Sequence, residues 1–346
     1  MTNRTNESQP VVVRLNVETC PPIPEEREIL GGINARVVEI EGDSDEEILA
    51  HAADCDALMV VASYVRTPVI RALRKCKVIS RLGIGTDKID VAEATRQGIM
   101  VTNIPGFCTN EVADHTMALL LAAARQLNYY QEHMRLGRPP AQVEEIHRLS
   151  TQKLGIVGFG RIGRAVAKRA SAFGMQILAH DPFISAAEAA AKGARLVDMD
   201  TLLAESDYLC LLCPLTDATR RALTLREFRR MKPTAVLVNT GRGELIDEDD
   251  LVTALRGGVI RYAALDVFGA INVFSPEGFP TDHPLFSVPN VLMTPHVAAY
   301  SIESGFEQKT KGAQAVADVL SGRWPEHLVN PEVVPRFPTS RPTPHS

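Results

Sequence analysis

Long apolar segments are missing from this chain of 346 residues, and so is a surplus of basic side chains. No hydrophobic run approaches the roughly 18 residues of a membrane-spanning helix, and the polar residues 1–10 are not expected to form a signal peptide. The chain has 37 Lys and Arg against 42 Asp and Glu, a net charge of −5. General nucleic-acid binding needs a basic face, so the charge argues against it. We therefore expect a cytoplasmic protein that binds neither a membrane nor a nucleic acid.

Cysteine is also sparse, with six residues scattered along the chain. Only Cys210 and Cys213 have CxxC spacing, and they lie inside the apolar run 208–215, which is typical of a strand. No second pair of metal ligands lies nearby in the sequence. Buried thiols are therefore favoured over zinc or redox chemistry, and we predict no metal site. Reduced thiols fit a cytoplasmic location.

Short apolar runs alternate with helix-like segments in two series. The first series runs from Val11 to Val101 and the second from Leu154 to Met293. Alternation of this kind predicts parallel sheets that are covered by helices on both faces. The hydrophobic content of 45% and the length are sufficient for two such domains. We predict an α/β protein with two Rossmann-like or flavodoxin-like domains and a cleft between them.

Two further helices define the predicted domain boundaries. A long apolar helix is expected from Asn110 to about Tyr130, between the two series. The helix predicted at Ser301–Leu320 follows the second series, which already has its strands, so it is expected to return to the first domain. We predict a discontinuous catalytic domain (1–110 and 299–330) and a nucleotide-binding domain (111–298). The proline-rich residues 331–346 are predicted to be disordered.

The most specific pattern is a glycine-rich turn between a strand and a helix. The apolar run Leu154–Val157 leads directly into Gly158-x-Gly160-x-x-Gly163. Gly158 is expected to make the tight turn, and Gly160 to let the backbone approach a pyrophosphate. Gly163 is expected to let the following helix pack closely on the strand. In this context the three glycines predict a dinucleotide site.

The next residues extend this predicted site. The backbone N–H groups of Arg161 and Ile162, at the start of the helix, are expected to face the phosphates. The second strand, 176–180, ends at Asp181, where an acidic residue binds the ribose hydroxyls. A carboxylate there repels a 2′-phosphate, and no basic residue follows closely in the sequence. NAD is therefore favoured over NADP.

Further local patterns follow one another between about Val11 and Asn330. They are Leu82-Gly-Ile-Gly-Thr-Asp-Lys-Ile-Asp90, Asn103-Ile-Pro-Gly106, Glu111-Val-Ala-Asp-His115, Cys213-Pro-Leu-Thr216, Val238-Asn-Thr-Gly-Arg-Gly243, Ala264-Leu-Asp-Val267 and Thr294-Pro-His296. Together with the glycine loop they resemble, in order and over nearly the whole chain, the D-isomer-specific 2-hydroxyacid dehydrogenases. The stretches around Arg81 and His296 are most similar to the C-terminal-binding-protein-like branch of that family.

The resemblance implies hydride transfer between nicotinamide C4 and a small 2-hydroxy or 2-oxo acid, or an acidic analogue such as a phosphonate. By resemblance, His296 takes or returns the hydroxyl proton. Arg242 holds the substrate carboxylate with its planar fork. The backbone N–H groups of Ile84 and Gly85 supply further donors to that carboxylate. Arg81 is either a second cation for a substrate with another acidic group or a structural residue.

The resemblance also implies cofactor contacts and an assembly. Asp266 matches the position that binds the nicotinamide carboxamide, and Cys213, Pro214 and Thr240 line the cofactor. The family's habit implies a homodimer through the helix at 110–130. Packing of that helix in the core of one subunit would give the same composition.

One departure from the family pattern puts the acid–base chemistry in question. The family carries a glutamate five residues after the aspartate matched by Asp266, where it orients the histidine. This chain has Ile271, which accepts no hydrogen bond. Either Glu277 replaces it, or the chemistry needs no strongly protonating histidine, or the chain is an NAD-responsive sensor, scaffold or corepressor-like protein with little turnover. The retained His296 and Arg242 favour an enzyme with an altered substrate.

Overall fold

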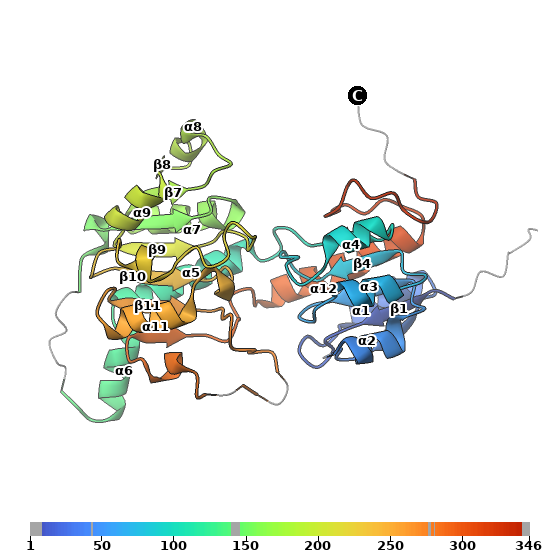
Figure 1. Ribbon diagram of the computed structural model, residues 1–346, viewed down its shortest axis with the longest axis horizontal. Coiled ribbons are helices and arrows are strands. Elements are labelled where there is room, and N and C mark those ends of the chain that lie inside the picture. Colours follow the sequence, from blue (N-terminus) through green and yellow to red (C-terminus); the bar gives the residue numbers. More distant parts are fainter. Residues whose placement is uncertain (1–8, 43, 140–145, 276–277, 280, 341–346) are drawn as a thin grey trace, which may run out of the picture. The chain divides into compact units, whose positions relative to one another are not determined.

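The chain folds into two compact units, each built around its own parallel sheet (Figure 1). The computed structural model describes residues 9–42, 44–139, 146–275, 278–279 and 281–340. Unit 1 comprises Met1–Phe107 and Ser301–Ser346, and unit 2 comprises Cys108–Tyr300. The predicted α/β fold class with two parallel-sheet domains is therefore confirmed. Among the described residues, no helix combines the length and apolarity needed to cross a membrane.

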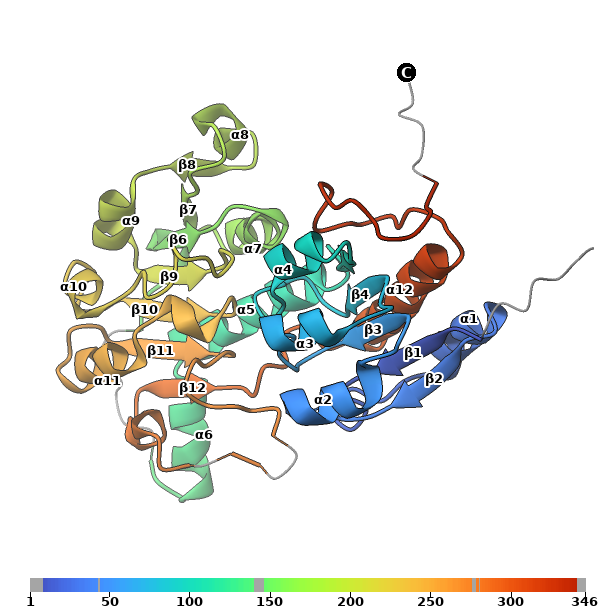
Figure 2. The same cartoon turned by 45° about the vertical axis from the view of Figure 1, so that its right-hand side comes forward.

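Unit 1 has a five-stranded sheet in the order β2-β1-β3-β4-β5, and Figure 2 labels the first four of these strands. Aliphatic residues dominate its strands, and β3 is buried along its whole length because helices cover both faces of a parallel sheet. The strands are β1 (Val11–Arg14), β2 (Arg36–Glu39), β3 (Ala57–Val60), β4 (Val78–Arg81) and β5 (Met100–Thr102). The helices are α1 (Pro24–Gly32), α2 (Asp45–Ala52), α3 (Thr67–Ala72), α4 (Val91–Arg96) and α12 (Ile302–Leu320).

The last helix, α12, packs in unit 1 although it follows unit 2 in the sequence. It begins at a capping box in which the Ser301 hydroxyl accepts a hydrogen bond from the Ser304 N–H. It contacts α1, β3 and β4, and the Ser80 hydroxyl of β4 donates to the Gly312 carbonyl at 3.1 Å. A side chain at Gly312 would meet Leu82 at 3.0 Å, so the glycine allows the helix to lie close to the sheet.

Residues 331–340 differ from the prediction of a disordered tail. Val333 is fully buried, and the Arg336 guanidinium donates to the carbonyls of Leu73 and Arg74. The Ser340 N–H donates to the Gly322 carbonyl at 2.9 Å. A proline-rich segment makes few hydrogen bonds within itself, so its composition predicts disorder. Composition does not reveal the contacts that this segment makes with other parts of the chain. Residues 341–346 lie outside the described part of the chain.

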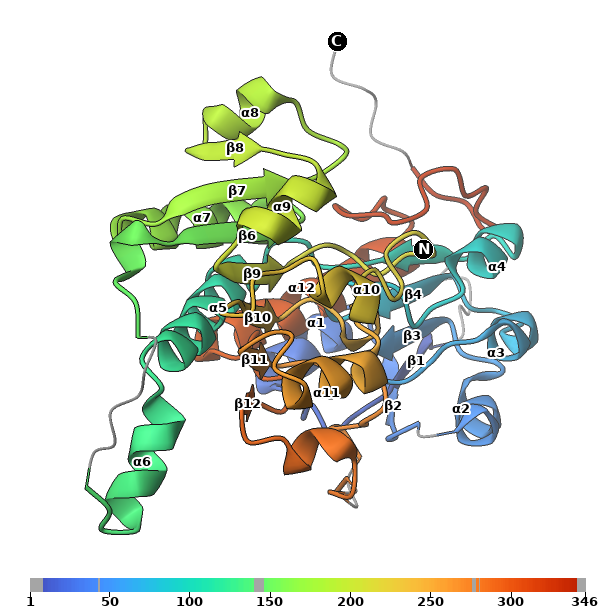
Figure 3. The same cartoon turned by 60° about the vertical axis from the view of Figure 1, so that its left-hand side comes forward.

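Unit 2 has a seven-stranded sheet in the order β12-β11-β10-β9-β6-β7-β8, which Figure 3 shows as a stack. The chain moves outward from β6 to β8 and returns beside β6 as β9, so the order reverses between β6 and β9. Ligands of such sheets bind at the carboxyl ends of the strands, at that reversal. The strands are β6 (Lys153–Val157), β7 (Gln176–His180), β8 (Ala194–Leu196), β9 (Tyr208–Leu211), β10 (Val236–Asn239), β11 (Tyr262–Leu265) and β12 (Val291–Met293).

The single helix predicted from Asn110 to Tyr130 is instead two helices. The chain takes a left-handed conformation at Gln126, with φ 54°, which separates α5 from α6. The helices of unit 2 are α5 (Thr109–Ala124), α6 (Leu127–Arg135), α7 (Arg161–Ala172), α8 (Ala186–Ala190), α9 (Met199–Glu205), α10 (Leu225–Phe228) and α11 (Glu248–Arg256), with 3₁₀ turns η1 (Leu149–Thr151), η2 (Gly243–Leu245) and η3 (Pro284–Ser287).

The two parts of the predicted dimer helix have different surroundings. Apolar residues of α5, among them Leu119 and Leu120, lie in the same hydrophobic core as β6 and β10. The helix α6 has no buried residue. The apolar composition of α5 is thus explained by packing within one subunit, and the homodimer stays a prediction.

Candidate active site

The three glycines of the turn after β6 have different surroundings. Gly158 has φ 90°, and a Cβ there would lie 2.6 Å from the Cys213 backbone nitrogen. A Cβ at Gly163 would lie 2.3 Å from the Gly158 carbonyl oxygen. A Cβ at Gly160 would meet nothing within 4 Å. The fold itself therefore requires the first and third glycines, whereas the second leaves open space beside the backbone.

This difference predicts two separate outcomes of alanine substitution. Gly160→Ala places its methyl group in open space, so we expect unfolding stability to be unchanged and NADH affinity to fall about tenfold or more, about 1.4 kcal/mol or more. Gly163→Ala forces the α7 backbone away from Gly158, so we expect a lower unfolding midpoint. Urea denaturation measures the stability of both variants, and fluorescence titration measures their NADH affinity. Equal NADH affinity of Gly160→Ala and the natural protein would contradict the assignment of Gly160 to the phosphate site.

The N-terminus of α7 adjoins this open space. The helix starts at Arg161 with Gly160 as its N-cap, so the N–H groups of Arg161 and Ile162 are among the first donors of the helix, which have no acceptor within it. Such donors, together with the helix dipole, favour an anion. The space beside Gly160 therefore suits the phosphates of a dinucleotide.

Asp181 follows β7 and ties the glycine turn to the end of that strand. Its Oδ2 accepts a hydrogen bond from the Phe159 N–H at 2.8 Å, and its Oδ1 accepts one from the Phe183 N–H at 2.9 Å. Each carboxylate oxygen can accept a second hydrogen bond, so both keep capacity for ribose hydroxyls. A hollow of about 520 Å³ lies beside Asp181 and is lined by His180, residues 195–198 and Thr201. These groups fit the adenosine half of a dinucleotide.

Tertiary structure adds one cation to this hollow that the sequence did not indicate. Arg195, on the edge strand β8, is among the lining residues. Its guanidinium forms an ion pair with Glu205 at 2.6 Å, and Lys153 binds the same carboxylate at 2.8 Å. Glu205 is therefore shared between two cations and offsets the charge of Arg195 only in part.

Cys213 and Pro214 follow β9, next to the glycine turn. The close approach of Gly158 to the Cys213 backbone places this segment at the predicted cofactor site. Burial raises the pKa of Cys210 to about 12 and that of Cys213 to about 11, so both thiols stay protonated at neutral pH. All six cysteines are free, as expected from their scattered positions.

Arg242 is presented just after β10. The Asn239 side chain accepts the Gly241 N–H at 3.1 Å and donates to the Arg242 carbonyl at 2.9 Å. The Thr240 hydroxyl lies 2.7 Å from that of Thr116 on α5. A Cβ at Gly243 would lie 2.0 Å from the Phe268 carbonyl carbon, so only glycine lets the two loops meet. The backbone around Arg242 is therefore held in place on both sides.

His296 lies in the loop after β12, in a conformation that is uncommon for histidine. Its φ is 58°, and its N–H donates to the Thr294 carbonyl at 3.0 Å. Its imidazole packs against the Phe274 ring, with centroids 5.0 Å apart and planes at 48°. Phe274 follows Ile271 in the loop that departs from the family pattern, and Ile271 is itself buried. Glu277 lies outside the described residues.

Asp266, at the end of β11, is fully buried and accepts several hydrogen bonds. The Thr294 hydroxyl donates to Oδ1 at 2.6 Å, and the Val297 and Ala298 N–H groups donate at 3.0 Å each. His115 Nε2, from α5, lies 3.4 Å from the same Oδ1. Burial by itself raises the pKa of Asp266, but the hydrogen bonds from His115, Thr294 and the two N–H groups lower it below its ordinary value. The carboxylate is therefore ionised at neutral pH.

In unit 1, carbonyl groups of the loop after β4 accept hydrogen bonds from residues that follow β5. The Gly83 carbonyl accepts the Ile104 N–H at 2.9 Å, and the Ile84 carbonyl accepts the Asn103 side chain at 2.8 Å. In a trans peptide the N–H points away from the C=O of the same unit. The N–H groups of Ile84 and Gly85 therefore point away from those acceptors. Two successive N–H groups are the donors that a backbone anion site uses, and carboxylate binding by Ile84 and Gly85 stays a prediction.

Arg81 braces this loop. Its guanidinium donates to the Gly85 carbonyl at 2.9 Å and to the Leu82 carbonyl at 2.6 Å. A Cβ at Gly83 would lie 2.6 Å from Arg81 Nη1, so the loop and the guanidinium are in close contact. Of the two roles considered for Arg81, these contacts support the structural one, and substrate binding stays a prediction.

Comparison with known proteins identifies the family. The family model described as "D-isomer specific 2-hydroxyacid dehydrogenase, NAD binding domain" matches residues 117–298. The glyoxylate reductase of Korarchaeum cryptofilum is 38% identical over 296 residues, which cover 84% of this chain and 87% of that protein. This chain belongs to the D-isomer-specific 2-hydroxyacid dehydrogenase family. The predicted family is thus confirmed, whereas the C-terminal-binding-protein-like branch stays a prediction.

Other relatives of this dehydrogenase differ in length and in their named substrates. The D-3-phosphoglycerate dehydrogenase of Methanocaldococcus jannaschii is 39% identical over 297 residues, and the chain spans only 55% of its length. The crystal structure of D-lactate dehydrogenase from Aquifex aeolicus with NAD and lactic acid has a TM-score of 0.82 and 26% identity, covering 90% of this chain and 96% of that one. A glyoxylate reductase structure from Paecilomyes thermophila has a TM-score of 0.82 and 29% identity, covering 94% and 99%.

NAD is the cofactor of this dehydrogenase family member, and the surroundings of Gly160 and Asp181 fit it. The loops that carry Arg242, Asp266 and His296 follow β10, β11 and β12, which are neighbours in the sheet. The carboxyl ends of parallel strands share one edge, so these loops gather beside the glycine turn. The arrangement brings a cation, a buried carboxylate and an imidazole to one edge of unit 2.

Sequence reasoning missed Phe274 and assigned no role to His115 or Thr294. Phe274 had no signal, because a single aromatic residue in a loop shows no periodicity. His115 and Thr294 were noticed only as parts of longer matched patterns. They are 179 residues apart in the sequence, and the fold brings His115 Nε2 to 2.9 Å from the Thr294 hydroxyl.

Proposed function

We propose that this NAD-dependent oxidoreductase transfers a hydride between nicotinamide and a small 2-hydroxy or 2-oxo acid. The observation that carries the proposal is the gathering of Arg242 and His296 at the strand edge that also holds the glycine turn. The names of relatives support the substrate class, since glyoxylate and lactate are both small acids. An acidic analogue such as a phosphonate belongs to the same proposal.

In this proposal each side chain has one chemical task. Bound nicotinamide supplies or accepts the hydride. Arg242 binds the substrate carboxylate through its guanidinium, which presents two parallel N–H donors to the two oxygens. His296 gives a proton to the substrate oxygen in reduction and takes it back in oxidation. The left-handed turn at His296 and the ring of Phe274 restrict the orientation of the imidazole.

The loop after β4 supplies the second proposed carboxylate contact. The N–H groups of Ile84 and Gly85 are directed away from their neighbouring carbonyls and suit an anion. The proposal also includes a direct contact of Asp266 with the nicotinamide carboxamide and a cleft between the domains. It further includes a homodimer and a cytoplasmic location. For the carboxamide contact, atoms that now cover the buried Asp266 must move aside.

A substrate panel tests the proposal. Glyoxylate, pyruvate, hydroxypyruvate, dicarboxylic 2-oxo acids and phosphonate analogues are offered with NADH or NADPH, and absorbance is followed at 340 nm. We expect NADH-linked turnover of at least one acid and a preference for NADH, because Asp181 repels a 2′-phosphate. The reverse panel offers hydroxy acids, formate and aldehyde hydrates with NAD. Tight NADH binding without turnover in either direction would contradict the proposed enzymatic activity and favour the sensor or corepressor-like alternative.

A further inference from the structure

A hydrogen-bond chain links α5 to the loop that carries His296. Asp266 is fully buried, and the Thr294 hydroxyl donates its only proton to Asp266 Oδ1 at 2.6 Å. The Thr294 oxygen is then left to accept the contact from His115 Nε2 at 2.9 Å. Nε2 of His115 must therefore carry a proton. The resulting order of donors runs from His115 through Thr294 to Asp266.

The other donors to Asp266 come from the residues immediately after His296. The Val297 N–H binds Oδ1, and the Ala298 N–H binds Oδ2, each at 3.0 Å. Together with Thr294, these groups hold the chain at both ends of the Pro295–His296 step. His296 itself has φ 58°, a strained conformation for a residue other than glycine, which persists only where the surroundings impose it. Asp266 supplies such surroundings.

We propose that His115 and Thr294 are positioning residues for His296, acting through the buried Asp266. The three side chains form a brace between α5, β11 and the loop after β12, and this brace holds the left-handed turn that aims the imidazole. Because Asp266 is ionised and charged groups make stronger hydrogen bonds, each donor contributes to fixing the turn. Of the three side chains, only Asp266 is proposed to reach the cofactor, so loss of His115 or Thr294 is expected to lower turnover while cofactor binding persists.

Two pairs of variants test the brace. Thr294→Val keeps the shape of the side chain and removes the hydroxyl, whereas Thr294→Ser keeps the hydroxyl and is the matched control. His115→Ala removes the donor, and His115→Gln restores an N–H donor at similar reach. We expect Thr294→Val and His115→Ala to lower kcat about 10–100-fold, as loss of an orienting partner does elsewhere. Thr294→Ser and His115→Gln are expected to recover most of that loss.

Two readouts separate positioning from other roles. NADH affinity, followed by fluorescence titration, is expected to stay the same in all four variants. The imidazole ¹H–¹⁵N signal of His296, assigned with His296→Ala, is expected to shift or broaden in Thr294→Val and not in Thr294→Ser. If NADH affinity falls in proportion to kcat, His115 and Thr294 act through cofactor binding and not through the turn at His296, and the proposal is overturned. An unchanged kcat together with an unchanged His296 signal would also overturn it.

The kcat readout of this inference rests on the proposed function. The nuclear magnetic resonance signal of His296 does not require turnover, so it distinguishes failure of the inference from failure of the proposed function. A natural protein without turnover would defeat the proposed function, while the His296 signal would still report on the brace. If Thr294→Val fails to fold, as judged by circular dichroism, the His115 pair provides the same comparison. The assays use the full chain.

Discussion

Replacing His296 by alanine is expected to lower kcat about 100–10,000-fold, the usual contribution of a positioned general acid or base. The imidazole is the group proposed to exchange a proton with the substrate oxygen, and alanine leaves only water for that task. NADH affinity is expected to persist, because the glycine turn and Asp181 remain intact. Steady-state kinetics on the best acid of the panel and NADH fluorescence titration measure the two quantities.

The matched control for this prediction is His51→Ala. His51 is an exposed residue in the last turn of α2, in unit 1, and the same substitution there is expected to leave kcat unchanged. Turnover of His296→Ala within about tenfold of the natural protein would remove His296 from the acid–base role, since that is less than a proton-transfer group contributes. Loss of NADH binding in His296→Ala would instead indicate that the loop after β12 supports the cofactor site.

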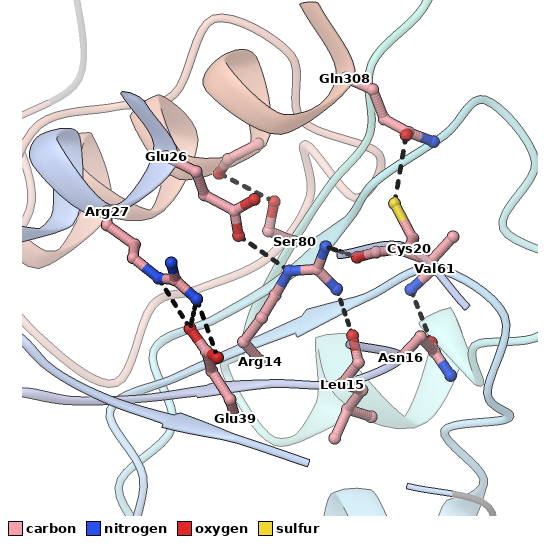
Figure 4. Close-up of polar contacts among 11 residues, drawn as sticks. Arg14, Leu15, Asn16, Cys20, Glu26, Arg27, Glu39, Val61, Ser80 and Gln308 are labelled. Atoms are coloured by element: carbon pink, nitrogen blue, oxygen red, sulfur yellow. Dashed lines mark hydrogen bonds and ion pairs between the residues drawn. The ribbon is translucent and has the colours of Figure 1, made fainter. Parts of the chain in front are cut away.

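Breaking the ion pair between Arg14 and Glu26 is expected to have the largest effect on stability. Figure 4 shows the pair in the core of unit 1, where Arg14 Nε and Glu26 Oε1 are 2.8 Å apart and the side chains are 0% and 2% exposed. Arg14 also donates to the carbonyls of Leu15 and Cys20. Arg14→Met leaves a buried carboxylate without its cation, and such a change costs about 3–5 kcal/mol. Urea denaturation measures the loss.

A neighbouring pair provides the matched control. Arg27 and Glu39 are 2.9 Å apart but 55% and 33% exposed, so Arg27→Met is expected to cost at most about 1 kcal/mol. The double variant Arg14→Met/Glu26→Leu removes both buried charges and is expected to regain much of the loss. A cost of Arg14→Met no greater than that of Arg27→Met would show that the buried pair does not stabilise unit 1.

Figure 4 also shows a contact that no local sequence pattern predicted. Asn16, just after β1, has φ 63°, and its Oδ1 accepts the Val61 N–H at 3.0 Å and the Ala62 N–H at 2.7 Å. This asparagine therefore joins the carboxyl ends of β1 and β3, which are neighbours in the sheet. Polar residues at a strand end show no periodicity, so their partners are not apparent until the strands are placed side by side.

Elements with a strong local pattern could be predicted from the sequence. The strand predicted at 176–180 has these bounds in the structure as β7, because its short apolar run is buried on a covered sheet. The edge strand β8 was missed, since its three residues include the exposed Arg195 and form no such run. The break at Gln126 was missed as well, because the apolar residues continue across it.

By itself, the sequence determined the glycine turn, the family and the NAD cofactor. Each of these depends on short motifs whose residues are close together in the sequence. Gly158 and Gly163 contact each other within one turn and the helix that follows it, so their spacing carries the geometry. Only the tertiary structure decided that Asp266 is buried beneath the His296 loop and bound to Thr294 and His115. These contacts join residues far apart in the chain, and a hydrogen bond depends on positions in space that no local spacing encodes.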